Sequence, residues 1–149
     1  MSDPVDHAVV VEESGNGPYA QFVSVGHHVM GEDEPERFGG QDTGPAPYEY
    51  LLAALGGCTA MTVRMYAKRH EWPLEKVKVE LRHEKLHSPG TGEAVDRFHR
   101  TIRLSGGLTD DQRRKLTQIA ESCPISRTLQ RPSEVVTYLA ENTTTAATV

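Results

Sequence analysis

Apolar positions recur along this chain with two different periods, and each period predicts its own kind of element. Between residues 47 and 70 they return every three or four positions. The members of this stripe are Leu51, Leu55, Cys58, Thr62 and Met65. Such spacing predicts a long helix with Cys58 on the side that faces the core. Pro47 suits the start of this helix, and Pro73 ends it.

A period of two, typical of half-exposed strands, predicts the elements on both sides of the helix. Residues 8–12 and 19–25 flank a Gly-Asn-Gly turn, which predicts an N-terminal hairpin that residues 27–30 are placed to extend. Residues 77–82 alternate clearly and residues 97–104 less clearly, around a Ser-Pro-Gly-Thr-Gly segment. This arrangement predicts a second, longer hairpin.

The C-terminal part of the chain predicts two helices and a last strand. Thr109, followed three residues later by Gln112, forms a capping box and starts a helix. Pro124 suits the first turn of another short helix, which places Cys123 near its N-cap. Residues 134–139 are expected to form the final strand.

These elements predict one α+β domain over residues 1–141 and a disordered tail over residues 142–149. The sequence has no internal repeat and no linker between domains. A chain of 149 residues can bury a core without a metal ion or a disulfide. Residues 31–43 are rich in Glu, Asp and Gly and lack periodicity, so we expect a loop there. Loops often carry functional residues.

Charge and the absence of long apolar runs argue against two classes of partner. The 16 basic and 21 acidic residues give a net charge of -5 and are interleaved, so nucleic acid is not expected as a partner. A membrane-spanning helix needs about 20 apolar residues, and the sequence has no such run, so we expect no membrane association. The first seven residues lack the pattern of a secretory signal. We therefore expect a cytoplasmic protein.

The chain has two cysteines, Cys58 and Cys123, and they are the strongest candidates for chemistry. A permanent disulfide is disfavoured in a reducing compartment, so a redox pair is the sharper hypothesis. A thiol has an ordinary pKa of about 8.5, and nucleophilic work requires a cation or a helix N-terminus that stabilises the thiolate. Cys58 has neither nearby in sequence, whereas Cys123 is predicted to lie at a helix start. A sulfenic acid formed on one thiol can condense with the other.

The simpler alternative is that both cysteines are small buried hydrophobic residues, which is the commonest state of free cysteine. Their separation in sequence does not decide between the two interpretations. No metal or other cofactor is expected, because the two cysteines lack a Cys-x-x-Cys spacing and the seven histidines are scattered.

Two longer stretches around the cysteines resemble the OsmC/Ohr family of thiol-dependent peroxidases. They are R-F-G-G-Q-D-T-G-P-A-P-Y-E-Y-L-L-A-A-L-G-G-C-T-A-M-T, from Arg37 to Thr62, and C-P-I-S-R-T-L, from Cys123 to Leu129. The order of the predicted elements between them also fits the family. The resemblance implies an α+β fold in which two chains form an intertwined homodimer, with antiparallel sheets around two central helices. It places an active site at each end of the dimer interface.

The same resemblance implies roles for individual residues. Cys58 corresponds to the peroxidatic thiol and Cys123 to the resolving thiol. Arg37, in its R-F-x-G setting, corresponds to the arginine that orients the peroxide and stabilises the thiolate. The alternative for Arg37 is a solvated charge among the acidic residues of its loop.

The candidate arginine partner, Glu49, departs from the family pattern. Family members usually place this glutamate directly after the proline, whereas here Tyr48 follows Pro47. At about 100° per residue, the nine residues from Glu49 to Cys58 (58 minus 49) put the two on nearly opposite helix faces. Glu49 is equally well explained as a first-turn acid favoured by the helix dipole.

Two functions follow as hypotheses. The first is a two-cysteine reductase that converts organic hydroperoxides to alcohols through a Cys58–Cys123 disulfide, in defence against oxidative or osmotic stress. A dithiol, by analogy with the family a lipoylated protein, would restore it. Leu51, Leu55 and Met61 could line a pocket for an alkyl chain, although their helical spacing first indicates core residues. The second is a non-catalytic dimeric module that binds a small molecule or senses redox state.

Overall fold

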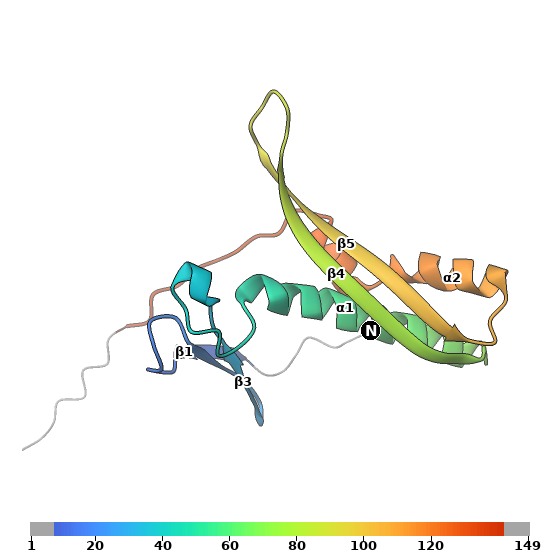
Figure 1. Ribbon diagram of the computed structural model, residues 1–149, viewed down its shortest axis with the longest axis horizontal. Coiled ribbons are helices and arrows are strands. Elements are labelled where there is room, and N and C mark those ends of the chain that lie inside the picture. The colour runs from blue at the N-terminus through green and yellow to red at the C-terminus, as the bar shows by residue number, and fades with distance from the viewer. Residues whose placement is uncertain (1–7, 142–149) are drawn as a thin grey trace, which may run out of the picture.

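The helix α1, Pro47–Arg69, runs through the middle of the α+β fold, and the other elements are arranged around it (Figure 1). The computed structural model describes residues 8–141. The further elements are β1 (Val9–Glu13), β2 (Gln21–Val25), β3 (His28–Glu32), the 3-10 helix η1 (Glu36–Phe38), β4 (Leu74–His87), β5 (Ala94–Gly106), α2 (Asp110–Ala120) and α3 (Pro124–Leu129). None of these helices is long and apolar enough to cross a membrane.

The predicted long helix is confirmed, but its buried face differs from the predicted stripe. Pro47 opens α1, and the Glu49 carboxylate accepts a hydrogen bond of 2.8 Å from the backbone amide of Ala46. The buried residues of α1 are Leu55, Gly56, Thr59, Val63 and Ala67. Met65 is 55% exposed, so the expectation that it faces the core of this chain is wrong, whereas Cys58 is half-buried beside the buried Cys123. The residues that pack inward are spaced four apart along the helix, from Leu55 to Ala67.

A long antiparallel hairpin, β4–β5, covers one side of α1 (Figure 1). Its strands extend beyond the predicted ranges at both ends. Val77 pairs with Leu104 and Leu81 with Arg100, so alternate residues of both strands face the helix. Helix α2 completes a core made of Val63, Ala67, Leu74, Leu116 and Ala120. The predicted capping box of α2 is confirmed, because Thr109 Oγ1 accepts from the amide of Gln112 at 3.1 Å.

A second sheet, with strand order β1-β2-β3, lies at the end of the molecule where α1 begins (Figure 1). The predicted N-terminal hairpin and its third strand are confirmed. Many apolar side chains of this sheet are exposed: Val9 60%, Val11 52%, Phe22 47% and Val29 66%. The sheet therefore lacks a packing partner for much of its apolar surface within the described chain.

The expected final strand over residues 134–139 is wrong for the described chain, which has no regular structure after α3. A strand requires the unpaired backbone edge of another strand. Here residues 134–139 pair with no strand, and Val135, Tyr138 and Leu139 are 88%, 86% and 98% exposed. The predicted tail over residues 142–149 lies outside the described residues.

Candidate active site

The two cysteines come together although they lie on different elements. Cys58 lies in the middle of α1, and Cys123 is the N-cap residue of α3. Both are free thiols, Cys123 buried and Cys58 half-buried, and they lie close enough for each to shift the pKa of the other. The thiol pair required by the redox hypothesis is therefore present in the geometry of one chain.

Local sequence explains why Cys123 faces the helix α1. The chain turns after α2 through Glu121 and Ser122, and Pro124 starts α3 at its first position. As N-cap, Cys123 has extended backbone angles, φ −56° and ψ 129°, and its sulfur accepts from the amide of Ser126 at 3.4 Å. The predicted helix start at Cys123 is confirmed. This conformation directs its sulfur inward, toward α1.

The surroundings of the two sulfurs differ in their effect on ionisation. Burial raises the pKa of the Cys58 thiol, and its hydrogen bond to Cys123 raises it further. Burial also opposes ionisation of Cys123. Hydrogen bonds from Cys58, the Ser126 amide and Thr59 outweigh this cost, and they hold the pKa of Cys123 below its ordinary value. In the single chain the two directions therefore favour a thiolate at Cys123 over one at Cys58.

The structure does not bring Arg37 or Glu49 to the thiols. Arg37 lies on η1, is exposed, and places its guanidinium carbon 4.8 Å from the centre of the Phe38 ring. Glu49 caps α1 through Ala46. Among residues 8–141, no hydrogen bond or ion pair links Arg37 to Glu49 or to either cysteine. Glu49 therefore lies as an acid of the first helical turn, and not as a partner of Arg37.

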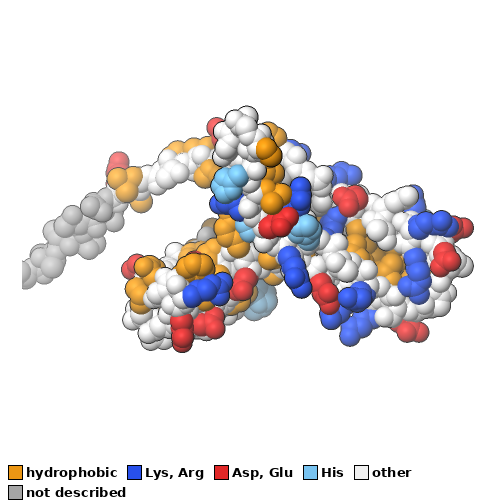
Figure 2. Space-filling view, turned by 45° about the horizontal axis from the view of Figure 1, so that its top comes forward, with side chains coloured by type: hydrophobic (Ala, Val, Ile, Leu, Met, Phe, Trp, Pro, Cys, Tyr) orange, Lys and Arg blue, Asp and Glu red, His pale blue; other side chains and the backbone are white. Residues whose placement is uncertain are grey.

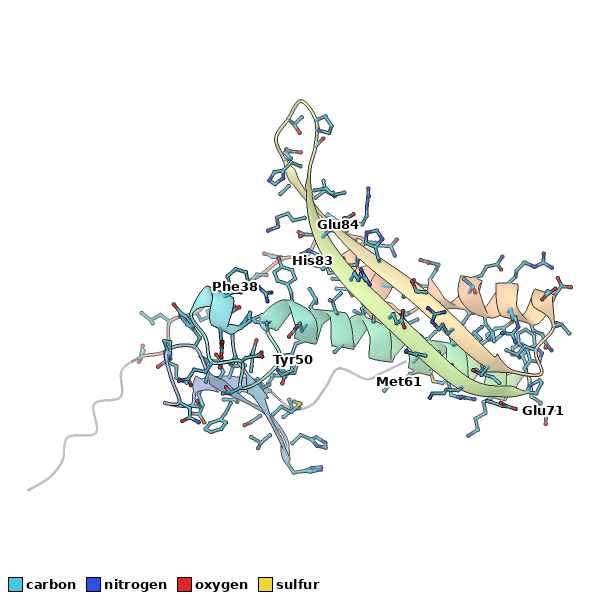
Figure 3. All side chains as sticks on the ribbon, in the orientation of Figure 1. Phe38, Tyr50, Met61, Glu71, His83 and Glu84 are labelled. Carbon is cyan, nitrogen blue, oxygen red and sulfur yellow. The ribbon has the colours of Figure 1, made fainter. Side chains whose placement is uncertain are left out.

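Tyr48 occupies the position directly after the proline, and it contacts the hairpin. Its ring stacks on His83 of β4 with 4.4 Å between the ring centres, and His83 stacks on Phe98 of β5 with 5.0 Å between the ring centres. The His83 ring also lies 2.7 Å from a carboxylate oxygen of Asp96. Figure 3 shows His83 above the first turns of α1. An aromatic stack thus joins the start of α1 to the hairpin. It begins at Tyr48, the position at which the family pattern has a glutamate.

One buried carboxylate organises the loop that carries Arg37. Asp33 is 2% exposed, and it accepts hydrogen bonds from the hydroxyl of Thr43 at 2.7 Å and from the amides of Glu34, Gln41 and Thr43. The Thr43 hydroxyl, followed by these amides, holds the pKa of Asp33 below its ordinary value, against the effect of burial. Asp33 was not among the predicted site residues, because an aspartate in an acidic loop has no distinguishing pattern.

An arginine absent from the sequence hypotheses lies beside the thiol pair. Arg100 of β5 donates from Nη1 to Thr59 Oγ1 at 2.9 Å and to the carbonyl of Ala120 at 3.2 Å. Its Nη2 lies 3.0 Å from Glu121 Oε1. A signal for it did exist, since Arg100 falls between Phe98 and Ile102 on the inward-facing positions of an alternating strand.

A cleft of about 640 Å³ opens beside Arg100. Its lining comes from the hairpin, α1, α3 and the end of α2: Leu55, Asp96, Arg97, Phe98, His99, Arg100, Glu121, Ser126, Leu129 and Gln130. Of the three predicted pocket residues, Leu55 lines this cleft and Leu51 does not. Met61, labelled in Figure 3, is 67% exposed. It borders a separate hollow beside the start of β4. Within residues 8–141, no three His, Cys, Asp or Glu side chains are grouped to hold a metal ion.

Comparison with known proteins decides the family. The sequence model of the family described as OsmC-like protein matches residues 40–137. The chain belongs to the OsmC family. No curated protein matches it.

Solved structures of OsmC and Ohr proteins share this fold. The organic hydroperoxide resistance protein OsmC of Legionella pneumophila has a TM-score of 0.65 at 18% identity, covering 87% of this chain and 92% of its own. An OsmC-like protein of Mycoplasma pneumoniae gives 0.68 at 17% identity, with 87% and 89% covered. The organic hydroperoxide resistance protein OhrB of Bacillus subtilis gives 0.58 at 17% identity, with 82% and 88% covered. At these identities the likeness establishes the fold of this OsmC-family chain.

Proposed function

We propose that this protein is a two-cysteine hydroperoxide reductase that acts on organic hydroperoxides in defence against oxidative or osmotic stress. The observation that carries the proposal is the proximity of Cys58 and Cys123, which come from separate elements and each shift the pKa of the other. Membership of the OsmC family and a fold shared with proteins named for organic hydroperoxide resistance support it.

The proposed reaction has three steps. The Cys58 thiolate attacks the distal oxygen of ROOH, an S–O bond forms, the O–O bond breaks, and the departing alkoxide takes a proton to become the alcohol. The Cys123 thiolate then attacks the sulfur of the Cys58 sulfenic acid, so that the S–S bond forms, the S–O bond breaks, and hydroxide leaves as water after protonation. A dithiol reduces the disulfide by exchange and is itself oxidised. A lipoylated protein would supply such a dithiol.

The first step needs a cation at Cys58, because burial raises the pKa of this thiol in the single chain. Arg37 remains the proposed source. Its loop is held by Asp33 near the start of α1, and the guanidinium is exposed and has no ion-pair partner within residues 8–141. The proposal therefore includes movement of this loop, or a contribution from a second chain, when hydroperoxide binds.

We also propose that the protein acts as a homodimer. Hydrophobic side chains lie on the surface of the lobe that holds the small sheet (Figure 2). The segment after α3 is extended and exposes Val135 and Leu139. Intertwining of two chains would cover both surfaces and give the segment a strand edge to pair with. A cytoplasmic location, where thiols are kept reduced, also fits two free cysteines.

The decisive experiment exposes the reduced protein to one equivalent of tert-butyl hydroperoxide and, separately, hydrogen peroxide. Remaining thiols are counted, and any disulfide is mapped by mass spectrometry. We expect a Cys58–Cys123 bond to form faster with the organic substrate. Cys58→Ser should abolish peroxide consumption, whereas Cys123→Ser should accumulate a sulfenic acid that over-oxidises. Undiminished turnover in Cys58→Ser would contradict the proposal.

A second candidate is a non-catalytic dimeric module that binds a small molecule or senses redox state. Its support is that Glu49 is bound to Ala46 and that Tyr48 stacks on His83. In this case both thiols would survive hydroperoxide while the dimer stays folded.

A further inference from the structure

Arg100 connects the two segments that carry the cysteines. One nitrogen, Nη1, donates to Thr59, the residue next to Cys58 on α1, and to the carbonyl of Ala120 at the end of α2. The other nitrogen pairs with Glu121, two residues before Cys123. The guanidinium is thus bonded to three groups that flank the thiol pair in space.

The cation is also enclosed. The Arg100 side chain is 11% exposed, whereas Thr59 and Cys123 are fully buried. Glu121, its ionic partner, is 68% exposed and therefore screened by solvent. A shielded cation next to a solvated anion leaves net positive potential on the buried side, where Cys123 lies.

The hydroxyl of Thr59 links the cation to the sulfur. It accepts the hydrogen bond from Arg100 and is itself a hydrogen-bonding neighbour of Cys123. In this structure the hydroxyl donates its proton to the carbonyl of Leu55 at 2.7 Å, so donation to a Cys123 thiolate requires the hydroxyl to rotate. A hydroxyl polarised by a guanidinium is a stronger donor to a thiolate than a free hydroxyl.

We propose that Arg100 is a positioning residue of the dithiol site, which acts through Thr59 to favour the thiolate of Cys123 and so speeds its attack on the oxidised Cys58. This inference rests on the proposed function and assigns the arginine to its second step. In that step the Cys123 thiolate forms the S–S bond, the S–O bond of the sulfenic acid breaks, and hydroxide leaves as water with one proton. Arg100 exchanges no proton and forms no covalent bond.

Charged and titratable groups reach Cys123 from each element packed around it. Cys58 comes from α1, Arg100 from β5 and Glu121 from the end of α2, and Arg127 of α3 is exposed. Asp96, Arg97 and His99 line the adjoining cleft from β5. Of these groups, Arg100 is the one that donates a hydrogen bond to Thr59, the neighbour of the Cys123 sulfur. Removing Arg100 should therefore change the pKa of Cys123 more than removing any of the others.

The first test measures ionisation without any peroxide. In a Cys58→Ser background the ultraviolet absorbance of the thiolate follows Cys123 alone as the pH is raised. We expect Arg100→Met to move the titration midpoint upward by about one pH unit. Thr59→Val should move it in the same direction, and Arg100→Lys, which keeps the charge, should restore much of it. An unchanged midpoint in Arg100→Met and Thr59→Val would overturn the proposal.

The second test follows one turnover with tert-butyl hydroperoxide in the protein with both cysteines, trapping sulfenic acid with dimedone. A rise of one unit cuts the thiolate fraction about tenfold, while a more basic thiolate is about threefold more nucleophilic, so disulfide formation should slow about threefold at neutral pH. At neutral pH, sulfenic acid should accumulate in Arg100→Met, and the difference in rate should shrink and then reverse as the pH rises above both titration midpoints. Equal slowing at every pH would mean a merely structural role.

Arg103→Met is the matched control, because Arg103 lies on the same strand, is 63% exposed and pairs with Glu80 at the surface. It should leave both the midpoint and the rate unchanged. If Arg100→Met does not fold, the titration midpoint and the rate of disulfide formation are compared between Thr59→Val and Arg100→Lys instead. Failure of the proposed function would look different, since the wild-type protein would then form neither sulfenic acid nor disulfide.

Discussion

Two charged side chains that sequence reasoning overlooked are enclosed in this protein, Asp33 at the Arg37 loop and Arg100 at the thiol pair. Each satisfies its charge by hydrogen bonds to neighbouring groups: Asp33 by Thr43 and three amides, Arg100 by Thr59, Ala120 and Glu121. Enclosed charges persist when such partners replace water. Both residues therefore fix segments that carry candidate catalytic groups.

The pH dependence of stability should reveal Asp33. Its folded pKa lies below the ordinary value, chiefly through Thr43, so the unfolded chain binds the proton more readily. The stabilisation is complete above about pH 4 and is lost as the pH falls toward the folded pKa. Asp33→Asn should lower the thermal midpoint at neutral pH and flatten the acid limb, as measured by circular dichroism. Asp42→Asn, in the same exposed loop, serves as the control, and equal curves for the two variants would contradict the assignment.

At the thiol site, the sequence predicted which residues carry the chemistry but not the groups that shift their pKa values. The pairing of Cys58 with Cys123 was implied by resemblance, and the N-cap position of Cys123 followed from Pro124. The lowered pKa of Cys123 depends on Cys58 and Thr59 from α1 and on Ser126 from α3, which meet only in the folded chain. No local pattern encodes such a convergence. An arginine at an inward position of an alternating strand was nevertheless readable at Arg100.

At the scale of elements, the approach of α1 to the hairpin depends on one glycine. A Cβ on Gly56 would lie 2.5 Å from Leu81 Cδ1, whereas a Cβ on Gly57 would meet no atom within 4 Å in this chain. Alanine improves the helix propensity of either site by about 0.8–1.0 kcal/mol. At position 56 the end of the Leu81 side chain must also move, and an off-rotamer shift costs about 0.5–1.5 kcal/mol.

We therefore expect Gly56→Ala to be less stable than Gly57→Ala by about 0.5–1.5 kcal/mol in urea unfolding. Gly57→Ala should be more stable than the wild-type protein. The two variants share the same change and adjacent positions, so the difference between them reports the helix–hairpin contact. Equal stabilities would show that the Leu81 side chain moves aside with no loss of folding free energy.

Elements defined by local pattern were predicted well, whereas those that need distant partners were not. The helices α1 and α2 and both hairpins follow from periodicity, proline positions, turn residues and the Thr109 capping box. The exposed face of α1 at Met65 and the absence of a strand over residues 134–139 depend on what else packs there. A strand in particular is a property of two segments, not of one.

At the scale of the whole molecule, the described chain leaves too much apolar surface uncovered. Val9, Val29, Val135 and Leu139 are between 60% and 98% exposed. Monomeric soluble proteins rarely expose contiguous apolar patches beyond a few hundred Å². This surface is the physical argument for the proposed homodimer, and it suggests that the wrong prediction for residues 134–139 concerns the single chain only.

Hydrogen exchange tests this idea at the segment where prediction and structure differ. In a homodimer whose second chain supplies a strand edge, the amides of residues 134–139 gain hydrogen bonds and should exchange slowly. Dilution that favours single chains should release this protection together with that of β1–β3, and the urea midpoint should rise with protein concentration because association stabilises the folded state by mass action. The core helix α2, which packs within one chain, is the internal control. Fast exchange at residues 134–139 in a sample shown by sedimentation to be dimeric would mean that another surface forms the interface.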